Sequence, residues 1–275
     1  MQIVAVSLVR NEDRFVRRAL QNVAASCDRI LVADHMSTDD TPDVLRDLAC
    51  EFDHLEVHRV KHSAESHALI EPFAGTDTWV LSVDGDELYD PAGLARFRDE
   101  LESGAYADVF RVRPAGLHCE ELDESRREAS GYLSPPSRPL VGLLNFAAFD
   151  SWSEVPHERL HAGEIAFRPG YDWDSWSHLG MERGWEESPF RTLHVCFLRR
   201  SSKDPEVLPA TGRQNLAESG AFRRDVLGPV ERFARRVLGR SVGGTREASE
   251  WKADKYRRGE RVSVDASAFI GDGRP

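Results

Sequence analysis

The sequence predicts an α/β protein whose strands form a mostly parallel sheet. In its first hundred residues, short apolar runs rich in β-branched residues alternate with stretches that carry apolar residues at helical spacing. This alternation favours parallel strands with helices on both faces of the sheet. The chain has 275 residues, of which 40% are hydrophobic and 30% charged. Such a composition suffices for one large packed domain with an appended segment.

The elements of the first half follow from their residue patterns. Strands are predicted at 3–8, 29–33, 55–60 and 78–83, where β-branched and apolar residues run together. A first helix follows Asn11 and carries Val16, Leu20 and Val23 on one face. Later helices are predicted after Thr41-Pro42, over 63–73, and from Asp90-Pro91 to about residue 101.

The second half is less regular. Strands are predicted at 108–113, 140–149, 164–167 and 192–198, and a loop or insertion at 120–139, which is rich in charge, Ser and Pro. From about residue 201 the pattern becomes helical and basic. We therefore divide the chain into a domain over 1–200, with halves 1–103 and 104–200, and a basic helical C-terminal segment over 201–275.

Charge and cysteines narrow the function classes. A net charge of −11 disfavours general nucleic-acid binding. The scattered cysteines form no CxxC pair, which indicates reduced and mostly buried thiols at Cys27, Cys50, Cys119 and Cys196. The N-terminus does not resemble a signal peptide and no apolar run is long enough to span a membrane, so we expect a cytoplasmic protein without a transmembrane segment.

Polar residues follow all the strands predicted in the first half. Because ligands of parallel sheets bind at the carboxyl ends of the strands, these residues are candidates for one site: Arg10, Asn11, Glu12, Asp34, Ser37, Asp39, Lys61, Asp84 and Asp86. Their carboxylates repel one another unless a cation is present, and oxygen ligands suit Mg²⁺ or Mn²⁺. Gly85 permits the tight turn between Asp84 and Asp86, and we expect Asp86 to face solvent.

Motifs in this region resemble the family 2 glycosyltransferases, which have the GT-A fold. The matching segments are VSLVRNE at 6–12, ILVADHMSTDDT at 30–41 and WVLSVDGDE at 79–87, the last similar to the family's DxD motif. The resemblance covers about residues 1–100, and VPHERL at 155–160 with HLG at 178–180 are weaker matches. It departs from the family pattern in the second motif, where His35-Met36 and Asp40 replace small residues and Gly.

The resemblance implies a GT-A-like domain over 1–200, with a nucleotide-sugar-binding half at 1–103 and an acceptor-side half at 104–200. It implies a metal-dependent, inverting transfer of a sugar from a nucleotide-diphosphate donor to the hydroxyl of an acceptor such as a saccharide or lipid-linked saccharide. Asp86 would hold Mg²⁺ or Mn²⁺ that neutralises the leaving diphosphate. Asp84 would bind ribose or the metal, and Asp34 the base or ribose. The remaining donor contacts would come from Arg10, Asn11, Glu12, Ser37, Asp39 and Lys61.

An inverting transfer also needs a carboxylate base for the acceptor hydroxyl. The resemblance implies Glu158, with Asp150 and Glu154 as alternatives. It also makes His178 a candidate metal ligand, with His157 and His194 as further contacts to metal or diphosphate. Structural roles compete with each assignment: a helix cap for Asp34, a surface ion pair with Arg159 for Glu158, and a core histidine for His178.

Two other functions remain as alternatives. A nucleotidyltransferase would also use an α/β sheet and metal-binding Asp residues, but segment 6–12 lacks the glycines of its phosphate loop. A non-catalytic nucleotide-sugar-binding relative is disfavoured by the intact Asp84/Asp86 pair. In the basic tail, apolar residues at 230, 233, 237 and 238 form a stripe. The stripe favours packing on the domain itself, with peripheral contact to an anionic membrane as the alternative.

Overall fold

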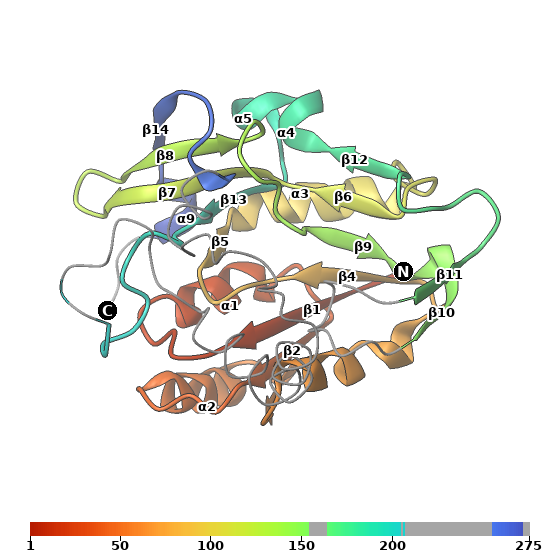
Figure 1. The fold of residues 1–275 in the computed structure, drawn as a ribbon, viewed down its shortest axis with the longest axis horizontal. Coiled ribbons are helices and arrows are strands. Elements are labelled where there is room, and N and C mark those ends of the chain that lie inside the picture. The colour runs from red at the N-terminus through yellow and green to blue at the C-terminus, as the bar shows by residue number, and fades with distance from the viewer. Residues whose placement is uncertain (154–163, 205, 207–254, 272–275) are drawn as a thin grey trace, which may run out of the picture.

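The first sheet confirms the predicted α/β fold. A computed structural model describes residues 1–153, 164–204, 206 and 255–271. Its seven-stranded sheet has the order β12-β6-β9-β4-β1-β2-β3 (Figure 1). The strands are β1 (Gln2–Val9), β2 (Arg29–Asp34), β3 (Leu55–Arg59), β4 (Thr78–Ser82), β6 (Arg111–Arg113), β9 (Leu143–Asn145) and β12 (Trp176–His178). Neighbours β4, β1, β2 and β3 are parallel, whereas β9 is antiparallel to both β4 and β6.

Three α-helices cover one face of this sheet. They are α1 (Val16–Ala24), α2 (Thr41–Glu51) and α3 (Pro91–Glu102), and their apolar faces share one core with alternate residues of β1, β2 and β4. Helix α3 begins as predicted at Asp90, whose side chain accepts a hydrogen bond from the backbone nitrogen of Gly93. The helices fit the sheet because their apolar residues recur at the helical period.

The opposite face is covered mainly by 3₁₀ helices and aromatic rings. The segment predicted as one helix over 63–73 forms η1 (Ser63–Leu69) and η2 (Glu71–Phe73), with Pro72 at the start of the second. Ile70 and Phe73 pack in a second core with Phe110 and Phe149. This core also takes in residues of η3 (Phe146–Ala148) and of the hairpin of β10 (Phe149–Ser153) and β11 (Glu164–Phe167).

A second sheet with the order β14-β8-β7-β13-β5 carries most of the second half. Its strands are β5 (Glu87–Tyr89), β7 (Ala115–Asp123), β8 (Glu128–Ser134), β13 (Arg191–His194) and β14 (Arg261–Asp265). Short helices α4 (Leu179–Glu182), α5 (Gly184–Glu187) and α9 (Ser267–Ile270) complete the described part. In Figure 1, β7 and β8 of this sheet are drawn in green and β14 in blue, above β1 and β2.

Two expectations for the second half are wrong. Segment 120–139, expected as a loop, contains most of the β7–β8 hairpin, because its small residues permit close pairing: a Cβ on Gly131 would lie 2.0 Å from the carbonyl oxygen of His118. In the C-terminal segment, expected to be helical, Arg261–Asp265 form β14, which pairs with β8. Valines alternate with polar residues in this strand, a strand pattern rather than a helical one. Residues 207–254, with the apolar stripe, lie outside the described part.

The described residues contain four free cysteines, of which Cys27, Cys119 and Cys196 are buried and Cys50 is exposed, as predicted. Among the same residues, no helix has the length and apolar character needed to cross a membrane.

Candidate functional site

The carboxyl ends of β1, β2, β3 and β4 meet at one edge of the first sheet, which we name the rim. These strands are parallel neighbours, so the turns that follow them are adjacent. The structure thus brings to one edge the residues predicted to bind the donor: Arg10, Asn11, Glu12, Asp34, Ser37, Asp39, Lys61, Asp84 and Asp86.

Hydrogen bonds join the turns after β1 and β2. The backbone nitrogen of Asn11 donates to Oγ of Ser37 at 2.9 Å, and Oδ1 of Asn11 accepts from the backbone nitrogen of Thr38 at 2.7 Å. Asn11 has a φ of +54°, in the left-handed region that Asn tolerates better than most residues. Oδ1 of the buried Asp34 accepts from the backbone nitrogen of Ser37 at 3.0 Å. Asn11, Asp34 and Ser37 therefore shape the rim.

The segment after β13 packs against these turns. Ser201 donates from Oγ to Oδ2 of Asp39 at 2.6 Å, and the backbone nitrogen of Ser202 donates to Oδ1 of Asp13 at 2.7 Å. Burial opposes ionisation of Asp39, but hydrogen bonds from Ser201 and Thr41 hold its pKa below the usual value. The ionised carboxylate of Asp39 therefore links the rim to the second half of the chain through its hydrogen bond from Ser201.

The two basic candidates lie at different depths. Arg10 is partly buried directly after β1. Lys61 is exposed after β3, and its backbone oxygen lies 3.0 Å from Nε2 of His35. Lys61 thus presents its ammonium group at the outer end of the rim.

Asp86 is not the solvent-facing residue that the sequence led us to expect. It is only 2% exposed, and its Oδ2 pairs with the guanidinium group of Arg200. The same oxygen lies 3.5 Å from Nε2 of His194. The turn that follows β4 folds under the second sheet, because β5 begins at Glu87 and pairs with β13. Asp84, by contrast, is only partly buried and stays nearer the surface.

Arg200 is the cation at the centre of this acidic group. Its Nη1 also lies 3.3 Å from Oε1 of Glu12, and both side chains are buried. Burial disfavours the charged guanidinium, but the charges of Asp86 and Glu12 raise the pKa of Arg200 overall. Burial and the charge of Asp84 raise the pKa of Glu87 to about 8. The site therefore concentrates carboxyl groups around one arginine.

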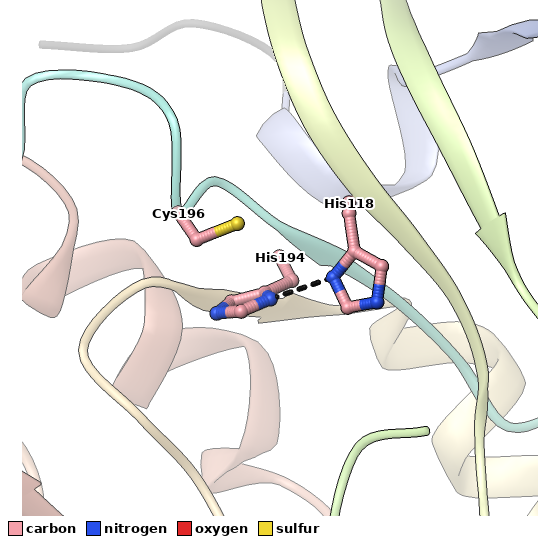
Figure 2. Close-up of side chains that lie close together, drawn as sticks. All are labelled: His118, His194 and Cys196. Atoms are coloured by element: carbon pink, nitrogen blue, oxygen red, sulfur yellow. Dashed lines mark hydrogen bonds between the residues drawn. The ribbon is translucent and has the colours of Figure 1, made fainter. Parts of the chain in front are cut away.

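Two histidines and a cysteine lie behind Asp86. Figure 2 shows His118, which comes from β7, beside His194 and Cys196. His194 is the last residue of β13, and Cys196 lies two positions further on. The Nδ1 atoms of the two histidines are 2.9 Å apart. Burial and the neighbouring charge of His194 lower the pKa of His118. Burial also opposes charge on His194, but the charges of Cys196 and Asp86 raise its pKa overall.

His178 does not join Asp84 and Asp86. It ends β12, three strands away from β4, which at the usual strand spacing is about 14 Å. Its ring nitrogens have no hydrogen-bond partner among the described residues, and burial lowers its pKa to about 4. His178 faces Arg113 across the β12–β6 pair instead, at the β12 edge of the sheet and away from Asp84 and Asp86.

Only one of the candidate bases, Asp150, lies within the described residues. Glu158, with His157 and Glu154, lies outside the described residues. Asp150 is exposed on β10 and accepts a hydrogen bond from Nε of Arg168 at 2.7 Å. The pairing with Arg168 makes Asp150 the weaker alternative base.

Sequence reasoning missed three residues of this site: Arg200, His118 and Cys196. Cys196 lies two positions after His194, and residues two apart on an extended segment face the same side. This spacing was the signal that could have placed Cys196 beside His194. No comparable signal links Arg200 to Asp86, because they are 114 positions apart in the chain.

Comparisons with known proteins give partial similarity only. No family model and no curated protein matches this sequence. Among solved structures, *S. aureus* TarS is similar with 16% identity and a TM-score of 0.36, covering 54% of this chain and 29% of TarS. Its fragment 1–349 in complex with UDP gives 16% identity and a TM-score of 0.37, covering 54% and 48%.

Two further structures are similar over part of the fold. The mannosyltransferase PcManGT from *Pyrobaculum calidifontis*, in complex with GDP-Man and Mn²⁺, has 20% identity and a TM-score of 0.34, covering 42% of this chain and 35% of its own. The 4-diphosphocytidyl-2C-methyl-D-erythritol synthase from *Anaerococcus prevotii* has 14% identity and a TM-score of 0.33, covering 53% and 70%. The chain thus spans less than half of TarS and of the mannosyltransferase, and similarities this low assign it neither family nor activity.

Proposed function

We propose that this protein is a glycosyltransferase that moves a sugar from a nucleotide-diphosphate donor to an acceptor hydroxyl. The observation that carries the proposal is the rim, where adjacent parallel strands gather the residues of all three resembling motifs. In this proposal, half 1–103 binds the donor and half 104–200 the acceptor.

Donor binding would use the polar groups of the first two turns. Asp34 would accept a hydrogen bond from the base or ribose, and Asp84 one from ribose. Asn11 would lie at the mouth of the nucleotide pocket, whereas the buried Glu12 would lie deeper, against Arg200. The hydrogen bonds of Asn11 with the Ser37 hydroxyl and the Thr38 backbone nitrogen support this role, because they fix the turns before ligand arrives and lower the entropic cost of binding.

The donor set around Asp84 and Asp86 fits a divalent cation. Both residues offer carboxylate oxygens, the ligands that Mg²⁺ and Mn²⁺ prefer. The raised pKa of Glu87, caused by burial and by the charges of Asp84 and Asp86, shows that negative charge accumulates there. Asp84 and Asp86 would hold the ion, and a bound ion supplies Lewis-acid neutralisation of charge on the leaving diphosphate.

Arg200 would hold Asp86 and Glu12 in place beneath the diphosphate. Its guanidinium is buried between these two carboxylates and positions both from one point. The backbone of the same segment also contacts the rim, since the backbone nitrogen of Arg14 donates to the carbonyl oxygen of Arg200 at 3.0 Å. The segment after β13 would thus fix the geometry of the donor site.

Acceptor binding would use the edge of the sheet that contains β6 and β12. Trp173 and Trp176 are 48% and 40% exposed there, which is unusual for tryptophan and suits stacking on a sugar ring. Arg113 lies over the ring of Trp176, with 5.3 Å from its guanidinium carbon to the ring centroid. These exposed aromatic side chains support a saccharide-bearing acceptor.

The base and stereochemistry belong to the proposal as well. Glu158 would remove the proton from the acceptor hydroxyl as it attacks, giving inversion at the transferred sugar. This assignment rests on the resemblance of segment 155–160. The free thiols of the described residues support action in a reducing compartment, the cytoplasm.

The leaving product tests the proposal against its main alternative. The protein is incubated with a panel of nucleotide sugars and saccharide acceptors in Mn²⁺, and the products are identified by mass spectrometry. A glycosyltransferase releases a nucleoside diphosphate and adds a sugar mass to the acceptor. Release of pyrophosphate would instead indicate a nucleotidyltransferase. Asp34→Ala should reduce turnover, whereas Asp99→Ala, an exposed change on α3, should not.

A further inference from the structure

A second chemical feature lies directly behind the donor site, and its chemistry does not depend on the donor. His118 and His194 face each other across the parallel pair β7–β13, and Cys196 follows two residues after His194. One ligand atom from each of these residues lies within 4.8 Å of the others. The side chains are buried, with exposures of 0%, 8% and 1%. We name them the His-His-Cys cluster (Figure 2).

The hydrogen bonds around the histidines fix which nitrogens face inward. Nε2 of His118 lies 2.8 Å from the carbonyl oxygen of Arg138, which can only accept, so this nitrogen carries the proton. Nε2 of His194 lies 3.5 Å from the Asp86 carboxylate, which likewise favours a proton on that nitrogen. With both Nε2 atoms directed at acceptors, the two Nδ1 atoms face each other.

The two Nδ1 atoms are 2.9 Å apart and share a hydrogen bond, so one of the two carries a proton. A metal ion can displace this proton and take both nitrogens as ligands. Cys196 adds a sulfur atom beside the pair, and a thiolate is a strong ligand for soft metals. We propose that the His-His-Cys cluster is a binding site for a Zn²⁺-type transition-metal ion, with Nδ1 of His118, Nδ1 of His194 and Sγ of Cys196 as ligands.

The distances fit such an ion once the sulfur closes from within 4.8 Å of the nitrogens to the spacing of a tetrahedral site. Tetrahedral zinc with Zn–N bonds of about 2.0–2.1 Å places two nitrogens about 3.3 Å apart, and a nitrogen and a thiolate sulfur about 3.6 Å apart. The 2.9 Å between the Nδ1 atoms would open by about 0.4 Å, within reach of small ring rotations. Within the described residues the group has three ligands, which leaves the fourth position to water.

The outer partners of the histidines match those of known metal sites. Metal-bound histidines usually donate their second N–H to a backbone carbonyl or a carboxylate, which fixes the ring and increases its basicity. Arg138 supplies a carbonyl oxygen to His118, and Asp86 supplies a carboxylate to His194. The ring of Tyr256 packs over both imidazoles, with centroid distances of 4.5 and 5.6 Å, and shields the cluster.

This ion differs from the one proposed for the donor diphosphate. Its ligands are nitrogen and sulfur rather than carboxylate oxygen, and hard ions such as Mg²⁺ prefer oxygen. It would tie β7 to the segment after β13 and, through His194, hold the position of Asp86. We therefore infer a structural and positioning role that holds whether or not the protein transfers sugars.

Metal binding to the full-length, untagged chain tests the inference directly. A chelator first removes bound metal from the protein. The protein is then titrated with Zn²⁺ in competition with a chromophoric chelator, and the number of bound metal ions per chain is measured by elemental mass spectrometry. Titration with Co²⁺ adds a spectroscopic readout, since thiolate-bound tetrahedral cobalt has a near-ultraviolet charge-transfer band. We expect one Zn²⁺ or Co²⁺ per chain and a clear thiolate-to-cobalt band.

Variants identify the ligands. Cys196→Ser should abolish the charge-transfer band, and His118→Gln should weaken Zn²⁺ binding at least tenfold. Cys27→Ser, which changes a buried cysteine elsewhere in the core, should leave both readouts unchanged. Failure of the wild-type chain to bind Zn²⁺ or Co²⁺ would overturn the inference even if a variant does not fold. Binding without a thiolate band, or a band that survives Cys196→Ser, would overturn it too, because the ion would then be bound by other residues.

Discussion

Removing Asp86 should destabilise the fold as well as impair donor chemistry. In the structure Asp86 is 2% exposed and pairs with Arg200, whose exposed fraction is 4%. Asp86→Ala leaves the buried guanidinium with one fewer carboxylate, and breaking a buried ion pair typically costs about 3–5 kcal/mol. Because Glu12 still lies 3.3 Å from Arg200, we expect the lower end of this range.

The predicted magnitude can be measured by unfolding. A loss of about 3 kcal/mol corresponds to a fall in melting temperature of about 6–12 °C for a protein of this size. Urea unfolding followed by circular dichroism gives the free energy directly. Asp84→Ala is the matched control in the same turn, and its partly exposed side chain should cost about 1 kcal/mol or less.

A double-mutant cycle separates the ion pair from other effects. Asp86→Ala combined with Arg200→Met should be less destabilising than the sum of the two single changes, by at least about 1 kcal/mol, because both partners of the pair are then absent. Additive losses, or an Asp86→Ala protein as stable as wild type, would show that the two side chains are not paired in the folded protein.

Three further predictions follow from the same residues and their neighbours. Asp34→Ala should weaken nucleoside-diphosphate binding by about 1–3 kcal/mol, the cost of an unsatisfied partner, and calorimetric titration with UDP and GDP measures it; unchanged affinity would place the pocket elsewhere. Glu158→Gln should slow transfer by about 10²–10⁴-fold with donor affinity retained, whereas a wild-type rate would exclude Glu158 as the base. Hydrogen bonds from Arg183 hold the pKa of Glu100 below its usual value, so this pair stabilises the fold above the unfolded pKa, and the stabilisation is lost as pH falls through the lowered folded pKa. Arg183→Met should therefore lower the melting temperature more at neutral pH than at about pH 3, and equal losses at both would contradict the assignment.

The first sheet was predictable because its strands are continuous apolar runs. The predicted ranges for β1, β2, β3 and β4 agree with the structure to within one or two residues at each end. Strands β1, β2 and β4 are buried on both faces, and burial leaves a strong signal in the sequence, whereas the edge strand β3 is partly exposed. The polar residues at their carboxyl ends could be placed on one edge for the same reason, since parallel neighbours align their ends.

The second half could not be predicted as well, because local composition and tertiary contacts disagree there. In the β7–β8 hairpin, Gly131 and Ser130 are poor strand formers, yet close pairing with β7 needs small residues at that point. The charge and proline content of 120–139 indicated a loop instead. Tertiary packing overrode the local preference.

The centre of the site depends on contacts between distant parts of the chain. Asp86 meets Arg200, and His118 meets His194 across 76 positions. A single sequence carries no record of such pairings, so Asp86 was expected to face solvent. The sequence made His194 a candidate contact to metal or diphosphate, but the proximity of His118 to His194 and Cys196 became evident only when β13 was placed beside β7.

The most direct test of the proposed function is the identity of the released product. Wild-type protein is incubated with each of several nucleotide sugars and a saccharide acceptor in Mn²⁺, and both the nucleotide product and the acceptor mass are determined. The proposal predicts a nucleoside diphosphate in amounts equal to the glycosylated acceptor, and a strong reduction of both by Asp34→Ala. Pyrophosphate as the product, or no turnover and no binding of any nucleotide sugar in the panel, would contradict it.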